Sequence, residues 1–221
     1  MGALYAVAAA ARDAGLLVIA DAKRGDIGIT AHAYAQSLVG VTPGPFGDVG
    51  GLGADAFTAN PLLGRDSLEP LVEGARAVSA CVFCLVRTSN PGAADLQDLP
   101  APTEPLYERL AAIVDALGAG GVAGCGLTDV GAVIGATRPE LLARLRELMP
   151  RAIFLLPGVG AQGGSVEGLG AAFSPHPAAG LVSASRSIVD AYRETRRDPA
   201  QAAAAAAEGL RAAAWDLSQS V

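Results

Sequence analysis

The sequence predicts an α/β protein with a parallel sheet covered by helices on both faces. Two observations lead to this fold class. Short runs that are apolar throughout recur along the chain, as is typical of strands buried on both faces; examples are "LLVIA" (16–20), "CVFCLV" (81–86) and "AIFLLP" (152–157). Helical segments alternate with these runs, which predicts repeated βα units.

The elements follow in order from the amino end. Residues 3–14 fit a helix, Gly15 stands where a glycine cap is expected, and residues 16–20 have the length of a buried strand. Residues 40–53, "GVTPGPFGDVGGLG", are rich in glycine and proline and predict an irregular loop. Asp198 and Pro199 predict an N-cap and a first-turn proline, so the chain is expected to end in a helix over about 199–217.

The middle of the chain repeats the same alternation. The remaining segments, in order, are strand 55–59, helix 66–78, strand 81–86, helix 105–117, the segments 130–137 and 139–148, strand 152–157, a glycine-rich loop and strand 180–185. They give about six βα units, whereas a closed (β/α)₈ barrel needs eight. We therefore expect a single domain over residues 1–221 of the (β/α)₈ TIM-barrel type, incomplete, with the first units absent.

Composition excludes several classes of function. The 22 acidic residues outnumber the 16 basic ones, and the longest basic run is the pair Arg196-Arg197, which argues against nucleic-acid binding and for a small ligand. The apolar start has no basic n-region and is interrupted at Arg12-Asp13, so we interpret it as a helix and a strand, and no membrane span is predicted.

The cysteines and histidines are expected to be structural. Three cysteines are an odd, sparse set that suits a reducing cytoplasm. Cys81 and Cys84 are three apart on a predicted strand and point to opposite faces, so they are predicted to be core thiols and no metal site is expected. His32 and His176 are likewise interpreted as structural.

The chemistry is expected at the carboxyl ends of the strands. The first strand leads into "DAKRGD", which contains Lys23, the one lysine beside 15 arginines. Asp21 and Lys23 share a face of the strand, and Asp26 follows in the loop. A structural ion pair is the plain interpretation, but arginine would serve there equally well, and only lysine can give up a proton near neutral pH.

Two later segments predict ligand contacts. "VRTSNPG" (86–92) places polar residues at a strand end, which by itself is also ordinary turn chemistry. "PGVGAQGG" (157–164) has four glycines in eight residues, and "SASRSI" (183–188) follows the last strand with Arg186. Loops after the last two barrel strands commonly bind phosphate, and arginine binds phosphate in a bidentate way, so a phosphate site is predicted here; its glycines include Gly158, Gly160 and Gly163.

Together, "DAKRGDIGIT", "NPLLG", "VRTSNPG", "PGVGAQGG" and "SASRSI" resemble the longer bacterial class of orotidine 5′-phosphate decarboxylases, over essentially the whole chain. The resemblance implies a dimeric (β/α)₈ barrel with shared active sites that converts orotidine 5′-phosphate to UMP and CO₂ without a cofactor. It implies that Lys23 protonates C6 of the pyrimidine, that Asp21 faces the substrate carboxylate, and that Asp26 with Thr30 reaches into the neighbouring subunit's site. It also implies that Ser89 contacts the pyrimidine and that Gln162 and Arg186 hold the phosphate.

The family also has two earlier strands, ending in an aspartate and a lysine, and Gly2–Gly15 matches the helix that precedes its third strand. The chain is thus expected to lack the first two strands and the first helix, which puts its own activity and stability in question. Two alternatives stay open: a sugar-phosphate decarboxylase or aldolase with the same D-x-K-x-x-D segment, often with Mg²⁺, and a non-catalytic nucleotide-binding remnant.

Overall fold

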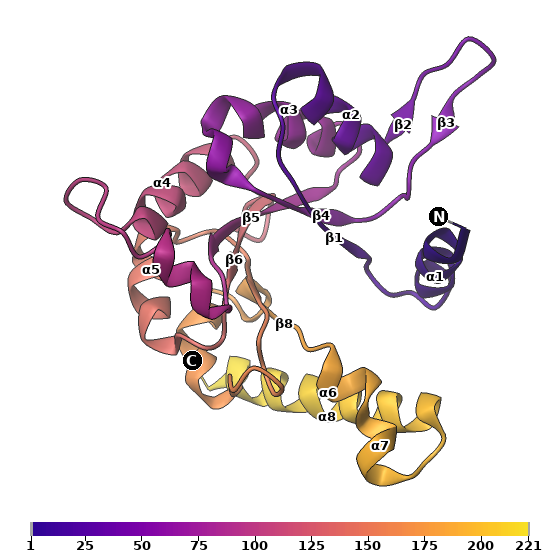
Figure 1. The fold of residues 1–221 in the computed structure, drawn as a ribbon, viewed down its shortest axis with the longest axis vertical. Coiled ribbons are helices and arrows are strands. Elements are labelled where there is room, and N and C mark those ends of the chain that lie inside the picture. Colours follow the sequence, from indigo (N-terminus) through magenta and orange to yellow (C-terminus); the bar gives the residue numbers. More distant parts are fainter. Residues whose placement is uncertain (1, 221) are drawn as a thin grey trace. The chain divides into compact units, whose positions relative to one another are not determined.

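The fold was analysed in a computed structural model that describes residues 2–220, so the two ends of the predicted domain, residues 1 and 221, lie outside the described part (Figure 1). The chain groups into two compact units. Unit 1 is Met1–Leu85 with Ala116–Gly131, and unit 2 is Val86–Asp115 with Ala132–Val221. That residues 1–221 act as one domain remains an expectation.

The parallel sheet predicted from the apolar runs is confirmed. Its strand order is β1-β4-β5-β6-β7-β8, and the pairs β1–β4, β4–β5, β6–β7 and β7–β8 are parallel. The strands are β1 (Ile19–Arg24), β4 (Ala56–Ala59), β5 (Cys81–Arg87), β6 (Val130–Ile134), β7 (Phe154–Leu156) and β8 (Gly180–Val182). All residues of β4, β6 and β7 are buried, as expected for parallel strands covered on both faces.

Unit 1 contains helices α1 (Gly2–Asp13), α2 (Gly28–Leu38) and α3 (Arg65–Arg76). The predicted cap after α1 is confirmed: Gly15 has φ +76°, and its N–H donates to the carbonyl of Arg12. Helix α2 packs closely on α3 at Gly74. A side chain at this position would not fit, because an added Cβ would lie 2.6 Å from Cβ of Ala35.

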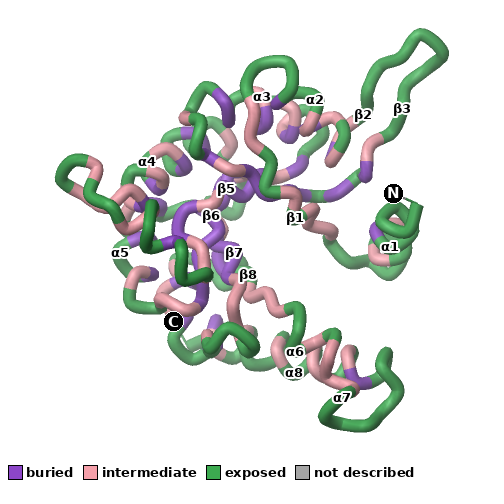
Figure 2. Tube along the Cα trace, viewed as in Figure 1, coloured by how far each residue is buried: buried purple, intermediate pink, exposed green. Residues whose placement is uncertain are grey.

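Three details of unit 1 differ from the sequence prediction. Strand β1 begins at Ile19 rather than residue 16, and Leu17 is 82% exposed, so the expected buried strand over 16–20 was wrong in its first half. Helix α2 was not predicted at all. The expected loop 40–53 contains a short antiparallel hairpin of β2 (Val41–Thr42) and β3 (Val49–Gly50), whose residues are exposed (Figure 2).

Unit 2 supplies α5 (Leu142–Leu148), α6 (Arg186–Val189), α7 (Ala191–Thr195) and α8 (Pro199–Gln219), and α4 (Leu106–Gly118) begins in it. The predicted start of the last helix is confirmed, because Oδ1 of Asp198 accepts from the N–H groups of Ala200 and Gln201 at 3.0 and 3.1 Å. None of the described helices is both long enough and apolar enough to cross a bilayer.

A buried arginine holds the end of unit 2 together. The guanidinium of Arg146 lies 3.7 Å from the ring centroid of Phe154, and burial lowers its pKa to about 10. Arginine suits such a place because its fork of N–H groups can serve several acceptors at once. Its Nη atoms donate to four backbone carbonyls, those of Met149, Ala152, Ala172 and Ala179.

Candidate active site

The first group of predicted site residues lies in unit 1, at the end of β1. The ammonium of Lys23 and the carboxylate of Asp21 form an ion pair, as their two-residue spacing on a strand predicted. Half of the Lys23 side chain and 62% of the Asp21 side chain remain exposed, so both groups are open to a ligand. Solvent around such an exposed pair reduces its contribution to stability, which favours a functional explanation for its presence.

A third residue, which the sequence did not single out, completes this group. Thr58 on β4 is fully buried, and its hydroxyl donates to Oδ1 of Asp21 at 2.9 Å. The same hydroxyl oxygen accepts from the backbone N–H of Lys23, also at 2.9 Å. The available signal was a polar residue inside the apolar run "DAFTA", next to the strand that contains the lysine.

The backbone at Lys23 is distorted. Ala20 pairs with Phe57 and Arg24 pairs with Ala59, so β1 uses four residue steps where β4 uses two. This bulge takes Lys23 out of the regular ladder and into the left-handed region, with φ +50°. Left-handed backbone is costly for a residue other than glycine, and such positions concentrate at functional sites.

The loop after Lys23 depends on a close backbone approach. A Cβ at Gly25 would lie 2.7 Å from the carbonyl oxygen of Asn60, so only glycine fits beside the start of "NPLLG". Asp26 accepts from the N–H of Ile27 at 2.8 Å, and Thr30 is exposed in the first turn of α2. Within residues 2–220 the ion pair of Lys23 is with Asp21, and Asp26 forms none with it.

The second group lies in unit 2, around the glycine-rich loop after β7. Gly158 has φ +101°, and a Cβ there would lie 3.0 Å from both Cβ of Ser89 and Oε1 of Gln162. Three of the predicted ligand residues are therefore brought together. Ser89 also lies against Gly135, because a Cβ added at Gly135 would be 2.6 Å from the Cα of Ser89. Gly135 and Gly158 therefore both leave space for the serine.

The rest of this loop is folded by its own backbone. The N–H of Gly163 donates to the carbonyl of Gly160, and the N–H of Gly160 donates to that of Gly164. Gly160 and Gly163 both have positive φ, which glycine adopts at little cost. A Cβ at Gly160 would lie 3.1 Å from the Ser187 side chain, which follows Arg186, the exposed first residue of α6.

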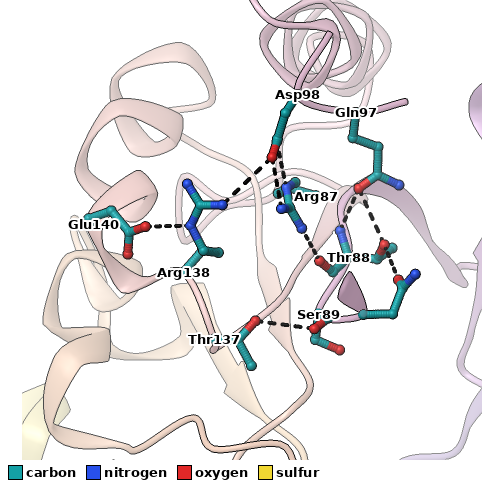
Figure 3. A network of polar contacts seen from close by, with 9 residues as sticks. Arg87, Thr88, Ser89, Gln97, Asp98, Thr137, Arg138 and Glu140 are labelled. Atoms are coloured by element: carbon teal, nitrogen blue, oxygen red, sulfur yellow. Dashed lines mark hydrogen bonds and ion pairs between the residues drawn. The ribbon is translucent and has the colours of Figure 1, made fainter. Parts of the chain in front are cut away.

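A polar network, not predicted from the sequence, supports the segment that contains Ser89 (Figure 3). The buried guanidinium of Arg87 donates from Nε and Nη2 to the Asp98 carboxylate at 2.8 and 3.0 Å, and from Nη1 to the Thr88 carbonyl. Hydrogen bonding from Arg87 lowers the pKa of Asp98. The Thr88 N–H donates to Oε1 of Gln97 at 2.8 Å, so the strand end is fixed from both sides.

The same network continues toward α5. Arg138 forms ion pairs with Asp98 at 3.6 Å and with Glu140, and the hydroxyl of Thr137 donates to the carbonyl of Ser89 at 3.3 Å (Figure 3). Ser89 is thus held through its backbone, while its hydroxyl takes part in none of these bonds. Hydrogen bonds and ion pairs of this kind, behind a candidate ligand residue such as Ser89, keep that residue in one orientation.

Cys81, Cys84 and His176 lie in structural positions, whereas Cys125 and His32 are exposed. Cys84 is fully buried, which raises the pKa of its thiol to about 12, and Cys81 is half-buried with a raised pKa. The ring of His176 caps a 3₁₀ turn by accepting from the N–H of Ala178. No group of three or more possible metal-ligating side chains occurs within the described residues.

Comparison with known proteins decides the family. The family described as orotidine 5′-phosphate decarboxylase / HUMPS has a model that matches residues 4–206. The chain belongs to this family. A relative from Rhodopirellula baltica, named orotidine 5′-phosphate decarboxylase, is 46% identical over 193 residues, and one of the same name from Deinococcus radiodurans is 45% identical over 186. These matches cover 87% and 84% of this chain, and the chain spans 63% of the length of each relative.

Solved structures of the family share the fold. The structure of Leishmania donovani OMP decarboxylase matches with a TM-score of 0.71 and 35% identity, covering 97% of this chain and 74% of that one. The six parallel strands with their helices therefore form an incomplete (β/α)₈ barrel, as predicted. In this chain, Lys23, Asp21, Ser89 and the glycine-rich loop stand at or after the ends of strands, where barrel enzymes bind their ligands.

Proposed function

We propose that the protein is an orotidine 5′-phosphate decarboxylase, a carbon–carbon lyase that makes UMP and CO₂ in pyrimidine biosynthesis. The observation that supports this most strongly is the solvent-open Asp21–Lys23 ion pair at the end of β1, in a chain whose family is named for this reaction. The two relatives described above have the same name. No metal or organic cofactor is proposed.

In the proposed reaction, the bond between C6 and the substrate carboxylate breaks, and its electron pair stays on C6. The ammonium of Lys23 stabilises the charge that develops there and then transfers a proton from Nζ to C6, leaving a neutral amine that solvent reprotonates. Asp21 orients the ammonium through their ion pair, and the Asp21 carboxylate beside that of the substrate favours departure of CO₂.

Unit 2 is proposed to bind the nucleotide. Ser89 contacts the pyrimidine, and the open backbone around Gly158, Gly160 and Gly163 receives the phosphate. Gln162 and Arg186 donate hydrogen bonds to the phosphate oxygens. Binding energy from the phosphate, remote from C6, orders the site for a reaction that takes place elsewhere on the substrate.

Asp26 and Thr30 are proposed to act on the neighbouring active site of a homodimer in the cytoplasm. Two observations support this proposal. Within residues 2–220, Asp26 forms no ion pair with Lys23 of its own chain, and Thr30 is exposed. Size-exclusion chromatography with light scattering tests the dimer, and complementation between an inactive Lys23→Ala chain and an inactive Asp26→Ala chain tests sharing. Mixed dimers should regain activity if the site is shared, and no regain would contradict sharing.

The substrate is tested by ultraviolet assay of orotidine 5′-phosphate loss. Because the chain spans 63% of the length of these curated relatives, the assay is run on the printed chain and on a form extended to the relatives' full length. Turnover by either form without added metal supports the proposal. Turnover of a ketose or hexulose phosphate with Mg²⁺, and none of orotidine 5′-phosphate by either form, would overturn it.

A further inference from the structure

We propose that Thr58 is a positioning residue for the proton donor: its buried hydroxyl fixes Lys23 and Asp21 relative to each other. The proposal rests on the proposed decarboxylase function and extends its machinery by one residue that does not touch the substrate. The observations behind it are two hydrogen bonds of 2.9 Å made by one hydroxyl, the bulge in β1 and the burial of Thr58.

The direction of both hydrogen bonds is determined by their partners. The backbone N–H of Lys23 can only donate, so the Thr58 oxygen must accept from it. The single hydroxyl proton is then free to point to Oδ1 of Asp21, which accepts it as a carboxylate. Thr58 therefore links the main chain of one charged residue to the side chain of the other.

The bulge explains why a side chain is needed for this link. In a regular parallel ladder alternate residues direct their N–H and C=O groups to the same neighbouring strand, and the carbonyls of Val18 and Arg24 both face β4, so the Lys23 N–H would point away from β4. The bulge instead turns this N–H toward β4, where the Thr58 hydroxyl accepts it. This hydrogen bond stabilises the left-handed backbone of Lys23. Without the hydroxyl, this conformation would lose its local hydrogen bond and Lys23 could relax toward extended backbone.

The carboxylate of Asp21 is fixed at both oxygens by this arrangement. Oδ1 accepts from Thr58, and Oδ2 accepts from the ammonium of Lys23. Neither charged side chain is held by burial, because both are at least half exposed. Thr58 itself has no exposed surface, so its role is to orient the pair and not to bind substrate.

The kinetic test compares Thr58→Val, which keeps the branched shape without the hydroxyl, with Thr58→Ser, which keeps the hydroxyl. The loss of one hydrogen bond to a charged group costs a free energy that corresponds to a rate about 10- to 100-fold lower. We expect Thr58→Val to lower kcat by that factor with little change in KM, and Thr58→Ser to restore most of it.

A matched control is Thr128→Val. Thr128 is also a buried threonine of unit 1, and its hydroxyl donates to the carbonyl of Val130 at 2.9 Å, so its loss should reduce stability and leave kcat unchanged. Equal kcat for Thr58→Val and the wild type, or an equal loss in Thr58→Val and Thr128→Val, would overturn the proposal.

A second measurement separates this proposal from the proposed function. Amide hydrogen exchange of Lys23, followed by NMR, reports its hydrogen bond whether or not the protein turns over substrate. Thr58→Val should make that amide exchange at least tenfold faster, and Thr58→Ser should keep it protected. Unchanged protection in Thr58→Val would refute the positioning role, whereas failure to decarboxylate with the expected exchange would refute only the function.

Discussion

At the scale of single residues, the identity of Lys23 was informative but its conformation was not. A lone lysine two residues after an aspartate indicated a proton donor, because arginine would have served a structural ion pair. Lys23 has positive φ, and its N–H donates to a hydroxyl 35 residues away in the chain, that of Thr58. No local pattern contains that information, so the sequence could not predict it.

Gly158→Ala tests the glycine-rich loop. The new methyl group would meet Ser89 and Gln162 at 3.0 Å, and alanine disfavours φ +101°. Displacing two ligand residues should weaken UMP binding about tenfold or more, which corresponds to ~1.4 kcal/mol. Isothermal titration calorimetry measures the affinity.

Gly126→Ala is the matched control, because Gly126 has φ +84° and open space around its Cα. It imposes a similar backbone strain in a place that the proposed ligand does not reach. If both variants lowered UMP affinity equally, strain alone would explain the loss and the contact argument for Gly158 would fail.

The three thiols should differ in reactivity. Cys84 is fully buried with its pKa raised to about 12, so it has almost no thiolate at pH 8, whereas Cys125 is exposed. Labelling with a chromogenic disulfide at pH 8 should modify Cys125 first and Cys84 only after denaturation. Rapid labelling of Cys84 in the folded protein, located by peptide mapping, would contradict its burial.

At the scale of elements, prediction succeeded where local chemistry decides the structure. Asp198 and Pro199 set the start of α8 as expected, and Gly15 ends the first helix. It failed for α2, whose sequence "GITAHAYAQSL" is dominated by small residues and has only Ala31 and Ala35 buried. Its contact with α3 through Gly74 depends on tertiary packing that a periodicity cannot show.

The Arg87–Asp98 ion pair should make the free energy of unfolding decrease at acid pH. Asp98→Ala leaves a buried guanidinium unpaired, and we expect a loss of about 2–3 kcal/mol, less than the ~3–5 kcal/mol of a fully buried pair, since Asp98 is 28% exposed. The folded pKa of Asp98 is lowered, so its contribution is complete above the unfolded value of 3.8 and disappears as pH falls through the folded value.

Urea unfolding at pH 7, 5 and below 4 checks this pH dependence. The difference between wild type and Asp98→Ala should be constant from pH 7 to 5 and shrink below pH 4. A difference that persists unchanged into strong acid would mean that the pair is not the source of the stabilisation.

At the scale of the whole molecule, the fold class followed from the pattern along the chain, because runs that are apolar throughout indicate strands buried on both faces and helical segments alternate with them. All six predicted strands occur, and the predicted site residues stand at or after their carboxyl ends. The supporting residues Arg87, Asp98 and Thr58 were missed. They act through contacts between segments far apart in the chain, and a sequence gives their type but not their neighbours.

The central claim is that Lys23 donates a proton, and the most direct measurement is the kcat of Lys23→Arg with orotidine 5′-phosphate. Arginine keeps the positive charge beside Asp21 but does not release a proton near neutral pH. We predict that kcat falls at least ~10²-fold, the lower end of the range for general acid catalysis, while UMP affinity by calorimetry changes little. A Lys23→Arg enzyme with wild-type kcat would contradict the account.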